Sequence, residues 1–265
     1  MSSTRFPWPE DSSAWWSFLT SLLGGLWLTQ GAHWQPGSVG LLVAALCLFL
    51  VSDWLSHLTG RSRQGKIVNT ERGHPLGFVL LISAGLGGAY FYLQLNVADL
   101  AIWQRIAVGA LCLLTLIFIL RLEWVALDSR LVFLTHLLLT LPALVFGFLH
   151  WGVGDGRAYE LWLPLAVYFP TQALFSVYWL QGKLAPSSAR SLLALPLLLG
   201  IVLLARSGSW LLTLFLAAFL ARAVTLLHHR QRSPKGLPDL ESIQYLGWEL
   251  HAWNAAFCWA WALRR

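Results

Sequence analysis

The sequence near its C-terminal end places three polar side chains in a strongly apolar, tryptophan-rich run, GWELHAWNAAFCWAW (residues 247–261). Glu249 and His251 can ionise, and Asn254 carries an amide. An ionised group inside a membrane costs at least a few kcal/mol, so such groups are kept where they find a partner or perform a function. Because a helix turns about 100° per residue, Glu249 and His251 lie about 200° apart and face different neighbours. We predict that Glu249 pairs with a cation inside the protein or belongs to a functional site.

Polar residues also occur within or beside other apolar runs. Asp53 and His57 are four residues apart, which places them on one face of a helix. Gln172 lies in a run that is unusual for its two prolines. Glu123 and Arg222 fall near the same predicted membrane surface and form an alternative pair. For residues near the ends of runs, contact with the membrane interface is the simpler explanation. We predict these candidates for a lipid or ligand site: Asp53, His57, Gln172, Arg222 and Glu249.

The spacing of two histidines raises the question of haem. His136 and His150 are fourteen residues apart in one apolar run, so a continuous helix places them on nearly the same face, about 21 Å apart. A protein that binds two haems between helices needs a second helix with a matching pair, and no other run has one. A single haem could be held by His150 with His33 or by His136 with His57. We predict no cofactor, and haem ligation by His136 and His150 stays open as an alternative.

Metal-assisted chemistry has little support in the sequence. The three cysteines lie in separate apolar runs, and they form neither a C-x-x-C motif nor a zinc-type spacing with histidine. No two aspartates lie within ten residues of each other, whereas Mg²⁺ bound to a diphosphate needs clustered carboxylates. We predict no metal site.

Membrane helices must position these side chains, because the composition is that of a polytopic membrane protein. The chain has 265 residues, of which 57% are hydrophobic and 11% charged, whereas a soluble domain is about one quarter charged. A helix needs about 20 apolar residues to cross a membrane. We predict an all-α bundle of nine transmembrane helices in a single domain, residues 1–265, over these apolar runs: 15–32, 38–57, 75–95, 99–121, 131–152, 159–181, 189–205, 208–228 and 241–263.

The basic residues of the loops predict the orientation. With nine crossings, the N-terminus and the loops after the second, fourth, sixth and eighth runs share one side, which carries 13 of the 18 lysines and arginines. The positive-inside rule places that side in the cytoplasm. The formal net charge of +6 then reports on topology and on anionic lipid headgroups. We expect membrane lipids and other membrane proteins as partners, a multi-pass location in the cytoplasmic (inner) membrane, and no nucleic acid.

Three segments of the sequence match the pattern of a known family. The first is PEDSSAWW, where Pro9, Ala14 and Trp15 fall in register and two serines stand where the family has His-Gly. The second is LFLVSDWLSHLTGRSRQGK, and the third is DLESIQYLGWEL with Gly247 and Glu249. In these segments the chain resembles the YwiC-like family of bacterial integral membrane proteins. The resemblance implies a UbiA-like scaffold, as in membrane prenyltransferases, without the aspartate-rich motifs. It also implies that Glu249 belongs to a family pattern.

Three functional hypotheses fit these observations, and the sequence leaves open whether the chain is an enzyme. The first is a non-catalytic accessory or structural subunit of a bacterial membrane complex. The second is a divergent UbiA-like enzyme or carrier that handles an isoprenoid or another lipid near Asp53, His57 and Glu249. The third is a haem- or quinone-binding subunit of an electron-transfer assembly that uses His136 and His150.

Overall fold

Each of the nine predicted apolar runs contains α-helix. The computed structural model describes residues 12–30, 36–58, 75–97, 101–119, 129–153, 155–181, 187–232 and 238–263, and these residues contain no β-strand. The all-α prediction is therefore confirmed for the described part of the chain. The elements in chain order are α1 (Ser12–Leu19), the π-helical turn η1 (Thr20–Gly24), α2 (Gly25–Gln30), α3 (Pro36–Leu58), α4 (Pro75–Val97), α5 (Ile102–Ile119), α6 (Ser129–Leu139), α7 (Leu141–Trp151), α8 (Gly156–Gln181), α9 (Ser187–Arg206), α10 (Trp210–Arg232) and α11 (Leu240–Ala262).

The helix boundaries agree with the predicted runs to within a few residues, except that two runs are interrupted. The π-helical turn η1 interrupts the first run, and Thr140 separates α6 from α7 in the fifth. The seventh and eighth runs are separate helices, as predicted. Between them, Gly208 has a φ of 75°, and the N–H groups of Gly208 and Ser209 donate to the carbonyls of Ala205 (3.2 Å) and Leu204 (2.9 Å). This is a Schellman ending, in which glycine supplies the left-handed conformation.

Three apolar helical stretches within the described residues are long enough to cross a membrane: Pro75–Gln94, Val132–Trp151 and Trp210–His229. Only 22% of the first stretch and 28% of the third are buried inside the protein. On α4, the exposed side chains include those of Phe78, Ile82 and Leu86. An apolar surface of this extent is unfavourable in water and suits contact with lipid. By length and composition, the chain is therefore a membrane protein with transmembrane helices.

The chain divides into two compact units, which are described separately. Unit 1 is Met1–Ala126 with Leu138–Trp162, and unit 2 is Leu127–Leu137 with Leu163–Arg265. Two of the three boundaries between them fall within α6 and within α8, and the third, after Ala126, lies outside the described residues. The single-domain organisation inferred from the sequence stays a prediction.

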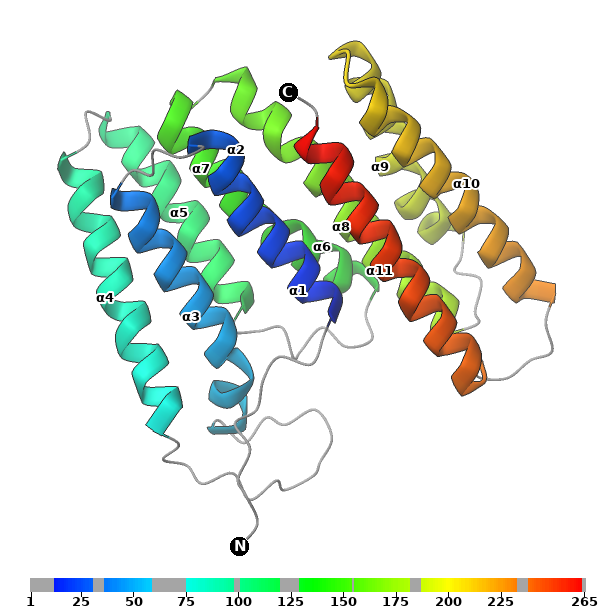
Figure 1. The fold of residues 1–265 in the computed structure, drawn as a ribbon, viewed down its shortest axis with the longest axis horizontal. Helices are drawn as coiled ribbons and strands as arrows, with labels where there is room; N and C mark the ends of the chain where they lie inside the picture. Colours follow the sequence, from blue (N-terminus) through cyan, green and yellow to red (C-terminus); the bar gives the residue numbers. More distant parts are fainter. Residues whose placement is uncertain are drawn as a thin grey trace, which may run out of the picture. The chain divides into compact units, whose positions relative to one another are not determined.

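Within unit 1, α3 and α4 lie side by side (Figure 1). Their closest approach is at Gly40 and Gly87, where a Cβ on either residue would lie 2.8 Å from the carbonyl oxygen of the other. Such small residues let two membrane helices pack backbone to backbone. The neighbouring Gly85 and Gly88 have no atom within 4 Å of their Cβ positions. Gly87 is thus the glycine of the α4 run that makes this close approach.

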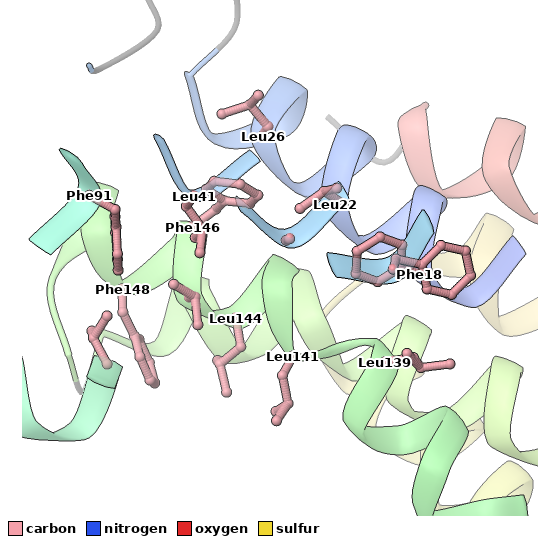
Figure 2. Packing of buried hydrophobic residues seen from close by; sticks show 14 of the residues in the cluster. Phe18, Leu22, Leu26, Leu41, Phe91, Leu139, Leu141, Leu144, Phe146 and Phe148 are labelled. Carbon is pink, nitrogen blue, oxygen red and sulfur yellow. The ribbon is translucent and has the colours of Figure 1, made fainter. Parts of the chain in front are cut away.

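The core of unit 1 joins the first helical segment to α7 (Figure 2). Phe18, Leu22 and Leu26 are fully or almost fully buried along α1, η1 and α2. Phe18 also stacks on Phe49 of α3, with ring centroids 4.5 Å apart. Between membrane helices this cohesion comes from van der Waals packing, because lipid tails are as apolar as the side chains themselves. The labelled residues that α7 contributes in Figure 2 are Leu141, Leu144, Phe146 and Phe148.

The core of unit 2 is an aromatic cluster around Tyr168 of α8. Tyr168 stacks on Phe257 of α11, with ring centroids 4.3 Å apart and an interplanar angle of 12°. Phe215 and Phe219 of α10 pack edge-on against Tyr168 at 5.4 and 5.1 Å. On α9, a Cβ at Gly200 would lie 2.8 Å from the side chain of Val167, so this helix also approaches α8 closely. The cluster ties together the helices that carry most of the predicted site residues.

Candidate functional site

Glu249 of α11 and Arg222 of α10 form a bidentate ion pair in unit 2. Arg222 Nε donates to Glu249 Oε1 at 2.6 Å, and Arg222 Nη2 donates to Oε2 at 2.9 Å. The indole N–H of Trp253 makes a longer bond of 3.4 Å to Oε1. A guanidinium and a carboxylate in this fork-to-fork arrangement form one of the strongest hydrogen-bonded contacts between side chains. The predicted pairing of Glu249 with a cation is confirmed.

The antiparallel arrangement of α10 and α11 brings these two charges to one level. Arg222 lies ten residues before the end of α10 at Arg232, and Glu249 lies nine residues after the beginning of α11 at Leu240. Two helices joined by a short connection place residues at equal distances from the turn side by side. This near-equality of ten and nine residues is the sequence signal that could have identified Arg222 as the partner. The alternative partner, Glu123, lies outside the described residues.

The beginning of α11 is fixed by Asp239. Its carboxylate accepts a hydrogen bond from the N–H of Ser242 at 3.1 Å, and its backbone is extended, with φ −65° and ψ 161°. This is the geometry of a helix N-cap. Hydrogen bonds from the side chain and the backbone of Ser242 lower the pKa of Asp239 below its ordinary value. The cap determines where α11 begins, and hence the level at which Glu249 meets α10.

Asn254 makes the second polar contact of this region. The hydroxyl of Tyr168 on α8 donates to Asn254 Oδ1 at 3.0 Å, and both side chains are buried. Asn254 belongs to the buried stripe of α11, together with Leu246 and Phe257. Tyr245, which the sequence places on the Glu249 face, is exposed, as are Ala252 and Ala256. The buried stripe of α11 therefore runs through Asn254 and not through the Glu249 face.

Gln172 is the predicted candidate that lies deepest in unit 2. Its side chain is 2% exposed, and its Oε1 has no hydrogen-bond partner among the described residues. On α8 it lies four residues after Tyr168 and three before Phe175, so all three share one face of the helix. We call Tyr168, Gln172, Arg222, Glu249, Trp253 and Asn254 the polar site of unit 2.

Two further candidates, Asp53 and His57, belong to unit 1. Asp53 and His57 fall within α3, and their side chains lie outside the described residues. Between them, Trp54 is buried, and its ring lies against Gly77 of α4, where a Cβ would be 2.5 Å from ring atoms. Their role in a ligand site stays a prediction.

The two histidines considered for haem do not lie on one continuous helix. His136 belongs to α6 and is buried, whereas His150 belongs to α7 and is exposed. Their placement on one face assumed an uninterrupted helix over residues 131–152. That assumption is wrong, because the helix is interrupted at Thr140. Haem ligation by either histidine stays untested.

A polar junction that the sequence did not lead us to expect lies at this interruption, in unit 1. The hydroxyl of Ser21 in η1 donates to the carbonyl of Thr140 at 2.6 Å and accepts from the N–H of Ala143 at 3.0 Å. The indole N–H of Trp162 donates to the Thr140 hydroxyl at 2.9 Å. The signal in the sequence is Thr-Leu-Pro at residues 140–142, a helix-start pattern with Pro142 near the first turn. Ser21 supplies from another helix the cap that Thr140 does not supply itself.

Within the described residues, no group of three or more His, Cys, Asp and Glu side chains is placed to hold a metal ion. No family model matches the chain, and comparisons with curated proteins and with solved structures find no match.

Proposed function

We propose that the chain is a non-catalytic, multi-pass protein of the cytoplasmic membrane that serves as an accessory or structural subunit of a larger membrane complex. The observation that carries this proposal is the bidentate ion pair between Arg222 and Glu249. A carboxylate whose two oxygens are both held by a guanidinium is poorly suited to transfer protons. The pair is better suited to hold α10 and α11 together, as the Tyr168–Asn254 hydrogen bond holds α8 and α11 together.

The proposed topology has nine crossings with the N-terminus in the cytoplasm. Its support is the excess of lysine and arginine on one set of loops, together with helices at each predicted run. The exposed apolar side chains of α4 and α10 favour contact with lipid or with other membrane proteins. We also propose membership of the YwiC-like family with a UbiA-like scaffold, which the sequence resemblance alone supports.

One observation favours a second function, that of an enzyme or carrier for an isoprenoid or another lipid. The buried Oε1 of Gln172 has no partner among the described residues, although buried polar groups in folded proteins are nearly always hydrogen-bonded. A bound molecule would supply the missing partner. This function uses Gln172 and leaves the Arg222–Glu249 pair in a supporting role.

Purification from native membranes distinguishes the two functions. The tagged chain is extracted in a mild detergent, and the proteins and lipids that accompany it are identified by mass spectrometry. An accessory subunit is expected to bring one or more membrane proteins in amounts comparable to its own. An unrelated polytopic protein with the same tag controls for non-specific capture. A chain that purifies alone, with one isoprenoid or lipid species bound in a fixed ratio, contradicts the first function and supports the second.

A further inference from the structure

We propose that the interior of unit 2 binds a neutral O–H donor at Oε1 of Gln172. The donor is an internal water molecule or the hydroxyl of a lipid. The site is independent of the accessory role proposed above, because it depends only on the hydrogen bonding of one buried amide.

The first support is the burial of an acceptor that has no donor. Gln172 is 2% exposed, so bulk solvent does not reach its side chain. Among the described residues, Oε1 accepts no hydrogen bond. Leaving a buried carbonyl unsatisfied is costly, and an ordered water or ligand is the usual explanation of such an atom.

The second support is the direction in which the Gln172 side chain leaves α8. Tyr168, Gln172 and Phe175 follow one another at intervals of four and three residues on one face. Tyr168 contacts Phe257 and Asn254 of α11, and Phe175 contacts Phe219 of α10 at 6.3 Å. Because Gln172 lies between Tyr168 and Phe175, its side chain is directed toward α10 and α11.

The third support is that the hydrogen-bonded polar side chains of α10 and α11 are bonded to other groups, while the hydroxyls of Thr135 and Tyr178 in the same unit are, like Gln172 Oε1, buried without a partner among the described residues. Asn254 Oδ1 accepts from Tyr168, and Arg222 is bonded to Glu249. Leu250, one turn before Asn254 on α11, packs against the cluster that contains Phe175. A carbonyl oxygen needs a donor, and water and lipid hydroxyls are the uncharged donors that an apolar interior admits at low cost.

A density map of the detergent-solubilised wild-type chain at about 2 Å resolution tests the site directly. An occupied site shows density at a hydrogen-bond distance of about 2.7–3.2 Å from Gln172 Oε1. A map in which this oxygen has no neighbouring density, or bonds to a protein donor, overturns the proposal. This measurement requires no variant.

Two variants provide a test by stability. Gln172→Leu replaces the amide with an apolar side chain of similar size. If a donor is bound, the variant loses that hydrogen bond and unfolds at a lower temperature than wild type. If the oxygen is unoccupied, the variant removes an unsatisfied group, and an unchanged or higher unfolding temperature overturns the proposal. Ser176→Ala is the matched control, because its hydroxyl bonds to the backbone carbonyl of Gln172 within the same helix.

Lipid analysis of the same samples separates the two sources of the O–H group. A lipid source predicts a hydroxyl-bearing lipid in fixed ratio to the wild-type chain, and its loss from Gln172→Leu. Water as the source predicts the density beside Oε1 with equal lipid content in both samples. Each result supports the site and identifies its occupant, whereas the absence of density beside Oε1 overturns the proposal whatever the lipid content.

Discussion

Arg222 and Glu249 are tolerated in the apolar unit 2 because each compensates the charge of the other. Arg222 and Glu249 share two hydrogen bonds, and the Glu249 carboxylate is the more buried member, with its side chain 15% exposed. In such a pair, the cost of removing one partner exceeds the net contribution of the intact pair, because a charge is left without compensation. A single substitution therefore reveals more than the double substitution does.

We expect Glu249→Gln to destabilise the chain by about 1–3 kcal/mol, between the values for exposed and for buried ion pairs, because both side chains are half-buried. The expected measurements are a lower unfolding temperature in detergent and a reduced yield of inserted protein. Replacing both Arg222 and Glu249 with methionine is expected to recover much of the loss. Arg157→Gln is the control, because Arg157 is exposed at the beginning of α8, where it pairs with Asp155. Wild-type behaviour of Glu249→Gln contradicts the role of the pair in holding α10 and α11 together.

The polar residues of the site could be identified from the sequence. Their hydrogen-bond partners could be identified only in part. The apolar setting of Glu249 predicts a cation partner, and the hairpin of α10 and α11 selects Arg222. The prolines and polar groups around Gln172 predict an unusual helix, but not that its Oε1 lacks a donor. The hydrogen-bond partner of Asn254 is Tyr168, which lies 86 residues earlier in the chain and was not predicted. Contacts between distant helices leave no periodic trace in the sequence.

At the scale of elements, the interruption between α6 and α7 shows how one helix completes another. Pro142 has no N–H to donate in the first turn of α7. The next residue, Ala143, donates its N–H to the Ser21 hydroxyl. Gly25 allows the contact, since a Cβ there would lie 2.7 Å from Ala143 Cα. The apolar run predicts one helix, because hydropathy does not show where the helix is interrupted. The carbonyl of Thr140 at the interruption accepts its hydrogen bond from Ser21, 119 residues earlier in the chain.

Ser21→Ala is expected to remove the acceptor of the Ala143 N–H, which keeps only its longer bond to the Thr140 carbonyl (3.3 Å), at a cost of about 0.5–1.5 kcal/mol. The unfolding temperature in detergent should fall, and amide exchange near Ala143 should accelerate. Thr29→Val is the matched control in the same helical segment, because the Thr29 hydroxyl bonds only to carbonyls of its own helix (Gly25 and Leu26). Equal effects of the two variants would show that the junction has no special contribution.

The N-cap of α11 predicts a pH dependence. The pKa of Asp239 is lowered by its bonds from Ser242, so the cap stabilises the folded chain fully above the ordinary aspartate pKa of about 3.9. That contribution is lost as the pH falls through the lower pKa of the folded state. Asp239→Asn keeps a capping side chain but cannot titrate. Its unfolding temperature should therefore decline less than that of wild type from about pH 5 to about pH 2. Parallel declines would exclude the cap as the source.

At the scale of the whole molecule, the apolar runs predict the helices well, because length and hydropathy are local properties. The division into two units was not predicted, because two of its three boundaries fall inside α6 and α8 and the division follows from contacts between distant segments. Topology depends on loop charge, and the connection between α9 and α10 is the most informative loop. Ser207 lies in it and is exposed, and Ser242 is exposed at the other end of the α10–α11 hairpin.

Single-cysteine labelling tests the proposed orientation at these two positions. In a chain whose three native cysteines are replaced by alanine, we expect a membrane-impermeant maleimide to label Ser207→Cys in intact cells. Ser242→Cys should react only after permeabilisation, because α10 separates the two positions and the positive-inside rule places Ser242 in the cytoplasm. The reverse pattern would invert the topology. Labelling of both positions in intact cells would mean that α10, with Arg222 on it, does not cross the membrane.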